Sequence, residues 1–328
     1  MSQREDVSLL NEETVIPYLF KRGVIKQDSQ VECFSGGISS VVLGIRNEDQ
    51  DIVLKQALPE LKTIINWPAD QRRTLTEARA MELLGFLTPK SVPKLVDVDL
   101  KEMTLCMERA PRDYLVWKDE LLKGNIDPTV GSQLGEILAI WHNFGAETKG
   151  VSDQFQESDV FEQLRVWPFY RVTEERNPQF KAKISQLIAE ITELKVTLVH
   201  GDYSPKNILV TNGRTPIVLD FEVMNFGNPV FDLAFLLAHL LCKQRRTDAV
   251  TEKDQLRRTA LDFVTAYSQR YQGLIAPSLP HHVALIALAR VDGVSLVNYL
   301  NDSKQREVRL VANRVLSSES PDLLELFQ

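Results

Sequence analysis

The stretch LVHGDYSPKNILV, residues 198–210, places a polar centre between two short apolar runs. Both runs have the composition of buried strands, so the polar centre is expected to be a loop. An Asn-Gly pair at residues 212–213 predicts a hairpin turn, and the strand PIVLD then ends at Asp220. Because a hairpin of this length returns its second strand beside the start of its first, we expect Asp202, Asn207 and Asp220 to converge at one edge of a small sheet.

Two carboxylates and a carboxamide oxygen are hard ligands of the kind that hold Mg²⁺ together with water and phosphate oxygens. One of the carboxylates can instead orient or deprotonate a hydroxyl group. Each residue alone is compatible with a simple turn cap. The whole set, H-x-D-x-x-x-x-N with D-F-x after the next strand, matches the phosphoryl-transfer pattern, in which these positions divide base and metal duties.

The segment SGGIS, residues 35–39, joins two β-rich runs near the start of the chain. Glycines leave room for backbone N–H groups to approach a phosphate, so Ser35, Gly36 and Gly37 are candidate nucleotide contacts. A plain hairpin turn would have the same sequence. The chain contains no G-x-x-x-x-G-K-[ST] motif, which argues against a P-loop nucleotide-binding protein.

A third predicted strand, residues 51–58, carries Lys55 among apolar residues. The lysine either lies at an exposed edge or has an acidic partner. Residues 70–87 predict a helix, on which Glu77 shares a face with apolar side chains and therefore needs a cation. We expect Lys55 to pair with Glu77 and to contact ATP phosphates, with Glu82 as the alternative partner.

Residues 92–111 predict two further strands, the second of which is LCMER. Its end can be an ordinary strand end or a hinge whose backbone bonds an adenine ring, with Met107, Glu108 and Arg109 as the contacts. After it the chain becomes mainly helical, for example over residues 129–147 and from residue 230 onward. We therefore expect a nucleotide-binding lobe over residues 1–108 and a catalytic and substrate-binding lobe over residues 109–328.

Length and composition support this organisation. A chain of 328 residues favours two domains, and its formal charge of −7 argues against nucleic acid as the main partner. The polar, acidic start does not resemble a signal peptide, and the apolar run over residues 230–241 is too short to span a membrane. Three cysteines without metal spacing, Cys33, Cys106 and Cys242, are expected to be buried thiols of a cytoplasmic protein.

These residues resemble the aminoglycoside phosphotransferase and choline kinase superfamily of small-molecule kinases. The resemblance rests on VHGDYSPKNILV, IVLDFEVMNFGNPVFDLAF, SGGIS, VLKQAL and EARAMELL, which occur in the family's order between residues 31 and 241. It implies an α+β, two-lobed protein-kinase-like fold with a small antiparallel-sheet N-terminal lobe and a larger, mainly helical C-terminal lobe. It also implies the cofactors ATP and Mg²⁺ and a small-molecule hydroxyl acceptor.

The resemblance also implies a role for individual residues. Asp202 would be the catalytic base, Asn207 and Asp220 the Mg²⁺ ligands, and Lys55 the phosphate-binding lysine. His200 and Asp232 would brace the catalytic loop, and Glu222 would assist the metal. Lys206 is either a solvated loop lysine or a contact to the substrate or the γ-phosphate.

Several alternatives stay open. KQALP followed by a Trp-Pro turn is similar to methylthioribose kinases, which are longer and lack an Asn at the position of Asn207. A protein kinase would need a longer segment between Asp220 and Asp232, and a nucleotide-binding pseudokinase would usually lack one of the catalytic residues. Arg290 and Asp292 either contact the acceptor or form an ion pair at a helix end. The acceptor and the oligomeric state are left undetermined.

Overall fold

The computed structural model describes residues 9–34, 39–61, 67–68, 70–156 and 159–328. The chain divides into two compact units, Met1–Arg112 and Asp113–Gln328. Arg109 forms an ion pair within the N-terminal unit, in which its Nη1 lies 2.7 Å from a carboxylate oxygen of Glu32.

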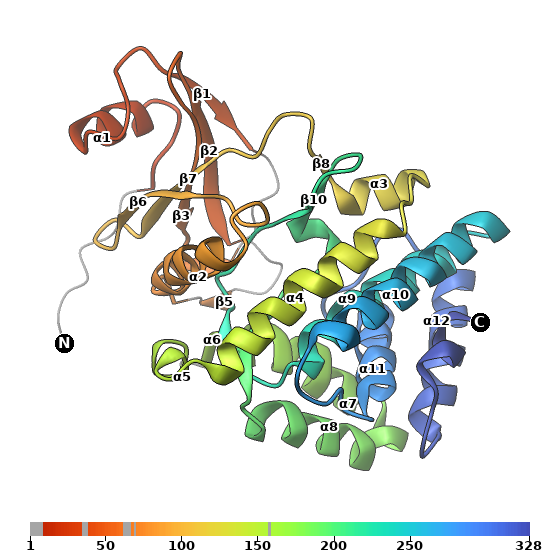
Figure 1. Cartoon of the computed structure of the whole chain (residues 1–328). Helices are drawn as coiled ribbons and strands as arrows, with labels where there is room; N and C mark the ends of the chain where they lie inside the picture. Colours follow the sequence, from red (N-terminus) through yellow and green to blue (C-terminus); the bar gives the residue numbers. More distant parts are fainter. Residues whose placement is uncertain (1–8, 35–38, 62–66, 69, 157–158) are drawn as a thin grey trace. The chain divides into compact units, whose positions relative to one another are not determined.

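The N-terminal unit is built on an antiparallel sheet with the strand order β1-β2-β3-β7-β6 (Figure 1). The strands are β1 (Gln30–Cys33), β2 (Ser40–Arg46), β3 (Asp51–Ala57), β6 (Leu95–Asp99) and β7 (Thr104–Glu108). All four pairings are antiparallel, which confirms the three strands expected from the first sixty residues and the hairpin expected after residue 92. A short pair, β4 (Glu60–Leu61) and β5 (Trp67–Pro68), follows β3.

The two faces of this sheet have different partners. Leu54 on β3 belongs to a core cluster that includes Val15 and Leu19 of helix α1 (Val15–Lys21). Successive strand residues point to opposite faces, so Lys55 lies on the other face, where it meets helix α2 (Arg73–Leu87). The expected helix over residues 70–87 is therefore present, whereas α1, with only two buried residues, had too weak a pattern to be predicted.

The C-terminal unit contains two small sheets. In the first, β10 (Ile208–Val210) pairs with β11 (Ile217–Val218) and with β8 (Leu115–Val116). In the second, β9 (Thr197–Val199) pairs with β12 (Asn225–Gly227). The hairpin at residues 212–213 is confirmed. The two apolar runs around the polar loop, however, belong to different sheets, because each pairs with a strand farther along the chain.

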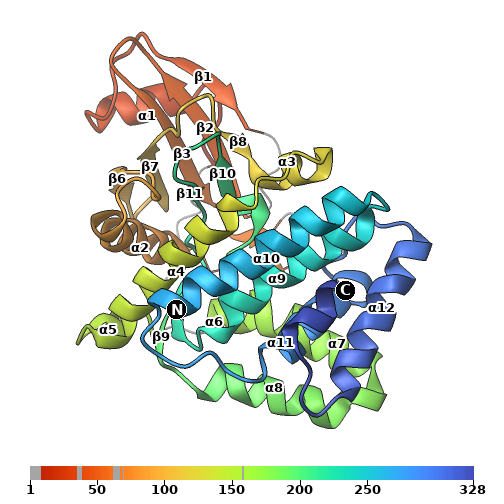
Figure 2. The ribbon, with the colours of Figure 1, turned by 45° about the vertical axis from the view of Figure 1, so that its right-hand side comes forward.

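Helices make up most of the C-terminal unit (Figures 1 and 2). The α-helices are α3 (Trp117–Lys123), α4 (Thr129–Glu147), α5 (Val151–Gln154), α6 (Asp159–Phe161), α7 (Val172–Arg176), α8 (Lys181–Glu193), α9 (Val230–Arg246), α10 (Val250–Arg270), α11 (Leu279–Asp292) and α12 (Asp302–Ser317). A π-helix covers Glu162–Arg171, and 3-10 turns cover Pro178–Phe180, Pro205–Asn207 and Leu323–Phe327.

Helices α4 and α10 lie side by side in both views (Figures 1 and 2). Two glycines of α4 permit this close approach. A Cβ atom added at Gly131 would lie 2.2 Å from the carbonyl oxygen of Thr259, and one at Gly135 would lie 2.3 Å from that of Phe263. The backbones of the two helices therefore meet without intervening side chains at these points.

Helix α9 is buried over most of its length, as its apolar sequence predicts. Among the residues that the structure describes, no helix is long and apolar enough to cross a membrane. Cys106 and Cys242 are buried thiols, but the expectation is wrong for Cys33, which is exposed. Cys33 ends an edge strand whose residues are mostly exposed, which agrees with the exposure of its thiol.

Candidate active site

The loop that follows β9 is anchored by the carboxylate of Asp232 on α9. Its oxygens accept hydrogen bonds from the backbone N–H groups of His200, at 2.7 Å, and Gly201, at 2.9 Å. Gly201 has a φ of +76°, and a Cβ atom there would lie 2.9 Å from the carbonyl oxygen of Val223. The turn therefore requires glycine, and the buried acid fixes the backbone just before Asp202.

Asp232 is itself held in place by buried polar side chains from two other helices. Nε2 of His142, on α4, lies 3.3 Å from Oδ2 of Asp232, and Nδ1 of His142 lies 2.8 Å from the hydroxyl of Tyr267 on α10. All three side chains are buried. Sequence reasoning missed His142, because a single histidine within an apolar helix carries no spacing signal.

His200 is buried and neutral. Burial is the main cause that lowers the pKa of its imidazole, and it outweighs the nearby carboxylates. Its Nδ1 accepts a hydrogen bond from the backbone N–H of Asp202 at 3.1 Å, so the ring proton is on Nε2. The protonated Nε2 is buried as well. The ring thus supports the loop backbone rather than the Asp202 carboxylate.

The Asp202 carboxylate lies between two cations. Its Oδ2 lies 2.9 Å from Nη2 of Arg165 and 2.8 Å from Nζ of Lys206. Burial by itself would raise the pKa of this carboxyl, but the charges of Arg165 and Lys206 outweigh burial and hold the pKa below its ordinary value. Asp202 is therefore an ionised, buried hydrogen-bond acceptor at neutral pH.

Arg165 is the functional candidate that sequence reasoning did not find. It lies on the π-helix, where Pro168 lacks the N–H that a regular helix would use. Its guanidinium also donates to the carbonyl oxygen of Gly201, which lies 36 residues later in the chain. Nothing in the local sequence around Arg165 indicates a contact over that distance.

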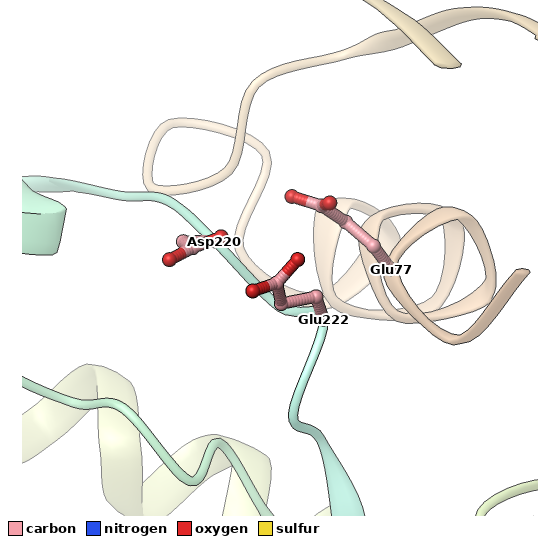
Figure 3. Close-up of side chains that lie close together, drawn as sticks. All are labelled: Glu77, Asp220 and Glu222. Atoms are coloured by element: carbon pink, nitrogen blue, oxygen red, sulfur yellow. The ribbon is translucent and has the colours of Figure 1, made fainter. Parts of the chain in front are cut away.

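Asp220 and Glu222 supply two carboxylates close to the part of the loop that carries Asn207. The backbone N–H of Leu219 donates to the carbonyl oxygen of Asn207 at 2.8 Å, so the loop and the end of β11 are adjacent. Asp220 has a φ of +70°, a left-handed conformation that is costly for a residue other than glycine. Carboxylate oxygens of Asp220 and Glu222 lie within 4.8 Å of one another, and Figure 3 shows both side chains on one extended segment.

This oxygen set fits a hard divalent cation. Nδ2 of Asn207 donates to the carbonyl oxygen of Asp202 at 3.1 Å. The Oδ1 of Asn207 makes no hydrogen bond within the part of the chain that the structure describes. Two neighbouring carboxylates and one amide oxygen are the donors that Mg²⁺ prefers.

In the N-terminal unit, Lys55 pairs with Glu77 rather than with Glu82. Nζ of Lys55 lies 2.7 and 2.8 Å from the two carboxylate oxygens of Glu77. The side chain of Glu77 is 3% exposed, that of Lys55 is 13% exposed, and Glu82 lies on the exposed side of α2. Figure 3 shows Glu77 on this helix. The pair fixes the direction in which the lysine leaves the sheet.

At the strand end, residues 107–109, two backbone N–H groups already make hydrogen bonds. The N–H of Glu108 donates to the carbonyl oxygen of Lys94, at 2.8 Å, and the N–H of Arg109 donates to that of Asp51, at 2.9 Å. Neither N–H is left for a nucleotide base, because β7 still pairs with its neighbours here. Ala110 is the next residue whose N–H makes no hydrogen bond within the described chain. Ser35, Gly36 and Gly37 lie outside the described residues.

The model of one protein family, described as the phosphotransferase enzyme family, matches residues 30–272, which is more than half of the chain. The chain belongs to this family. Among curated proteins, it is 25% identical over 263 residues to the methylthioribose kinase of Bacillus cereus strain AH820, a match that covers 71% of the chain. The chain spans 66% of the length of that relative.

Solved structures show that other proteins share this fold. The macrolide 2′-phosphotransferase MphH of Brachybacterium faecium is 18% identical, with a TM-score of 0.54 over 94% of this chain and 100% of that one. A choline/ethanolamine kinase family protein of Mesorhizobium loti is 15% identical, with a TM-score of 0.53 over 90% of each chain. The α+β, protein-kinase-like fold expected from the sequence is confirmed.

Proposed function

We propose that this member of the phosphotransferase enzyme family is an ATP- and Mg²⁺-dependent kinase that phosphorylates a hydroxyl group of a small molecule. The observation that carries the proposal is the buried, ionised carboxylate of Asp202, on a loop whose backbone is fixed by Asp232. A carboxylate in this setting can orient an attacking hydroxyl and accept its proton.

In the proposed reaction, the acceptor hydroxyl oxygen bonds to the γ-phosphorus of ATP while the bond from that phosphorus to the β,γ-bridging oxygen breaks. ADP leaves, and the hydroxyl proton passes to Asp202 and then to solvent. Because the Arg165 and Lys206 charges hold the pKa of Asp202 low, the carboxylate acts mainly by positioning the hydroxyl. Lys206, whose side chain is 53% exposed, can turn from Asp202 toward the transferred phosphoryl group.

The oxygen donors of Asn207, Asp220 and Glu222 would hold Mg²⁺. The ion supplies charge neutralisation of the ATP phosphates when bound. Asn207 and Asp220 are held in place by the backbone hydrogen bond between Leu219 and Asn207. The strained backbone of Asp220 is consistent with a functional demand on the direction of its carboxylate.

The N-terminal unit would bind the nucleotide. Lys55, oriented by Glu77, would contact phosphate oxygens, and the backbone of Ser35, Gly36 and Gly37 would approach them. For the adenine edge, we place one hinge contact at the N–H of Ala110, which makes no hydrogen bond to any described residue and lies one residue beyond the expected Met107–Arg109. The bounds of the lobes, residues 1–108 and 109–328, belong to this proposal.

Two alternative functions differ in what they require. A sugar kinase similar to methylthioribose kinase is favoured by the match to the Bacillus cereus enzyme, and it is a special case of the proposal. A nucleotide-binding pseudokinase would bind ATP without turnover. The complete set of Lys55, Asp202, Asn207 and Asp220 favours an active enzyme over the pseudokinase.

Replacing Asp202 by Asn tests the proposal, because it removes the charge and keeps the shape. The measurement uses an acceptor that the wild-type protein phosphorylates. In Asp202→Asn, kcat should fall by roughly 10²–10⁴, while the affinity for Mg·ATP, measured by calorimetry, stays the same. Asp254→Asn, an exposed acid on α10, is the matched control and should retain full turnover. Full turnover in Asp202→Asn would remove the carboxylate from the chemistry. Mg·ATP binding without turnover of any acceptor would favour the pseudokinase.

A further inference from the structure

A group of cations in the C-terminal unit extends from Asp202 into the helical core. Arg165, which contacts Asp202, lies over the ring of Phe235 on α9, with 5.7 Å from Cζ to the ring centroid. Phe235 contacts the ring of Phe169, with centroids 5.1 Å apart. Cζ of Arg290, on α11, lies 5.8 Å from the centroid of Phe169. Two aromatic rings that meet edge to face thus connect the candidate base to a second arginine.

Lys243 lies on the same helix as Phe235 and belongs to the same region. The ring of Phe235 contacts that of His239, with centroids 5.1 Å apart, and Lys243 follows His239 by one helical turn. The residue is only 1% exposed, and its Nζ lies 5.3 Å from the ring centroid of Tyr299. Within the described residues it has neither an ion pair nor a hydrogen bond. Burying a lysine amino group without a partner is costly, and burial is the main cause that lowers the pKa of Lys243 to about 7. A nearby anion would favour the charged form of this group.

Arg290 is also incompletely satisfied. Its Nη1 donates to the hydroxyl of Ser295 at 2.5 Å, but its Nε is buried and has no partner in the described part of the chain. The hydroxyl of Tyr299 is buried without a partner as well. Asp292, the other charge near the end of α11, pairs with Arg309 at 2.8 Å and does not neutralise Arg290. The sequence left open whether Arg290 and Asp292 act together, and the structure separates them.

The lowered pKa of His239, which lies among these cations, agrees with an excess of positive charge in this region. The pKa of His239 lies well below its ordinary value, first because of burial and then because of the charges of Arg290, Lys243, Lys206 and Lys118. His239 is therefore neutral and adds no further cation. Among the described residues, the only carboxylate within ion-pair distance of Arg165, Lys206, Lys243 or Arg290 is that of Asp202.

We propose that the acceptor is an anion, a hydroxyl compound whose carboxylate or phosphate group binds Lys243 and Arg290 while its hydroxyl reaches Asp202. The inference rests on the proposed kinase function and adds the substrate class. An anionic group would supply the counter-charge that Lys243 lacks and acceptors for Arg290 Nε and the Tyr299 hydroxyl. Cationic acceptors such as choline and aminoglycosides would be repelled by the same groups.

Matched acceptors test the charge preference. Glucose, gluconate and glucose 6-phosphate share a polyhydroxyl body and differ in charge, and ADP release reports their turnover. At least one anion should exceed glucose in kcat/KM by about 10- to 100-fold, and choline and kanamycin should be poor acceptors. Comparing kcat/KM for gluconate and for glucose 6-phosphate shows whether the site prefers a carboxylate or a phosphate group. A preference for glucose, choline or kanamycin would overturn the inference and leave the kinase function standing.

Binding without turnover separates the two proposals. Gluconate and inorganic phosphate are titrated by calorimetry into the protein saturated with Mg·ADP, which blocks the nucleotide site. Lys243→Met and Arg290→Met should weaken anion binding by about 10- to 100-fold, and Arg290→Lys should restore part of it. Lys195→Met, an exposed lysine, is the matched control and should bind like the wild type.

Thermal unfolding establishes that each variant is folded before it is titrated. Anion binding that depends on Lys243 and Arg290, in a protein that phosphorylates no acceptor, would support the anion site and contradict the kinase proposal. Failure of the wild type to bind either anion, or equal affinity in wild type and Lys243→Met, would overturn the inference.

Discussion

Arg165 contacts both the backbone and the side chain of the candidate catalytic loop. Its guanidinium donates to the carbonyl oxygen of Gly201, and its Nη2 lies 2.9 Å from Oδ2 of Asp202. One side chain from the π-helix thus sets both the position and the charge environment of the proposed base. Burial would raise the pKa of Asp202, but the charges of Arg165 and Lys206 outweigh it and hold that pKa below its ordinary value.

Arg165→Met should change the pH dependence of catalysis as well as its rate. Removing the cation raises the pKa of Asp202, and the base must be ionised to accept a hydrogen bond. The acidic limb of kcat/KM should therefore move to higher pH, with kcat lower by about 10- to 100-fold. Arg171→Met, which removes a half-exposed arginine that pairs with Glu162 on the same helix, should leave the limb in place. An unshifted limb in Arg165→Met would show that Arg165 does not control the ionisation of Asp202.

Asp232→Asn should loosen the catalytic loop. An amide can accept only through its one oxygen, so one of the bonds from the His200 and Gly201 N–H groups is lost. We expect about 2–3 kcal/mol less stability to urea, because hydrogen bonds to charged groups are worth that much, together with lower kcat. Hydrogen exchange should be faster at both amides, whereas Asp262→Asn on the surface of α10 should change neither. Unchanged exchange at these amides would contradict the bracing role.

Lys55→Met should cost stability as well as nucleotide affinity. It removes the cation that contacts both oxygens of Glu77, which is nearly fully buried. Breaking a buried pair costs about 3 kcal/mol or more, so urea unfolding should show a large loss. The double variant Lys55→Met/Glu77→Gln should recover much of that stability without recovering Mg·ATP affinity. Recovery of both would mean that Lys55 serves only to neutralise Glu77.

Lys243→Met should stabilise the protein near neutral pH. Burial is the main cause that lowers the pKa of Lys243 to about 7, whereas an unfolded lysine titrates near 10.4. The unfolded chain binds more protons between these values, so wild-type stability gains from rising pH in that window. Below about pH 7 the folded protein bears the full cost of burying the charged Lys243. Lys243→Met removes this cost and should raise the free energy of unfolding by about 1–3 kcal/mol in that range.

Urea unfolding at about pH 6.5, 7.5, 8.5 and 9.5 measures this difference between wild type and variant. Lys195→Met should follow the wild-type profile. A stability loss in Lys243→Met at every pH would show that the ammonium is satisfied inside the folded protein, which would also weaken the case for an anion site.

Local patterns were sufficient to predict much of the fold. Helix α4 matches the predicted segment 129–147, and β3 with α2 delivers Lys55 and Glu77 because strand alternation and helical spacing determine those faces. The hairpin after the loop follows from its Asn-Gly turn. The expected cytoplasmic location stays a prediction.

Long-range contacts limited the prediction of the site. The pairing of β9 with β12 and the contact of Arg165 with Gly201 depend on segments that are distant in sequence. Lys243, near the end of an apolar helix, has the pattern of a solvated helix terminus, yet the packing of α11 and α12 on α9 buries it. No periodicity within α9 contains that information.

The π-helix makes chain length itself a determinant of the active site. Each residue of an α-helix turns its side chain by about 100°, so deleting one residue between Arg165 and Arg171 would rotate Arg165 relative to everything that follows. Such a deletion would withdraw the guanidinium from Asp202 without altering any catalytic residue. Relatives that differ here by one inserted or deleted residue would therefore keep the same loop motif, but the pKa of the carboxylate at the position of Asp202 would differ.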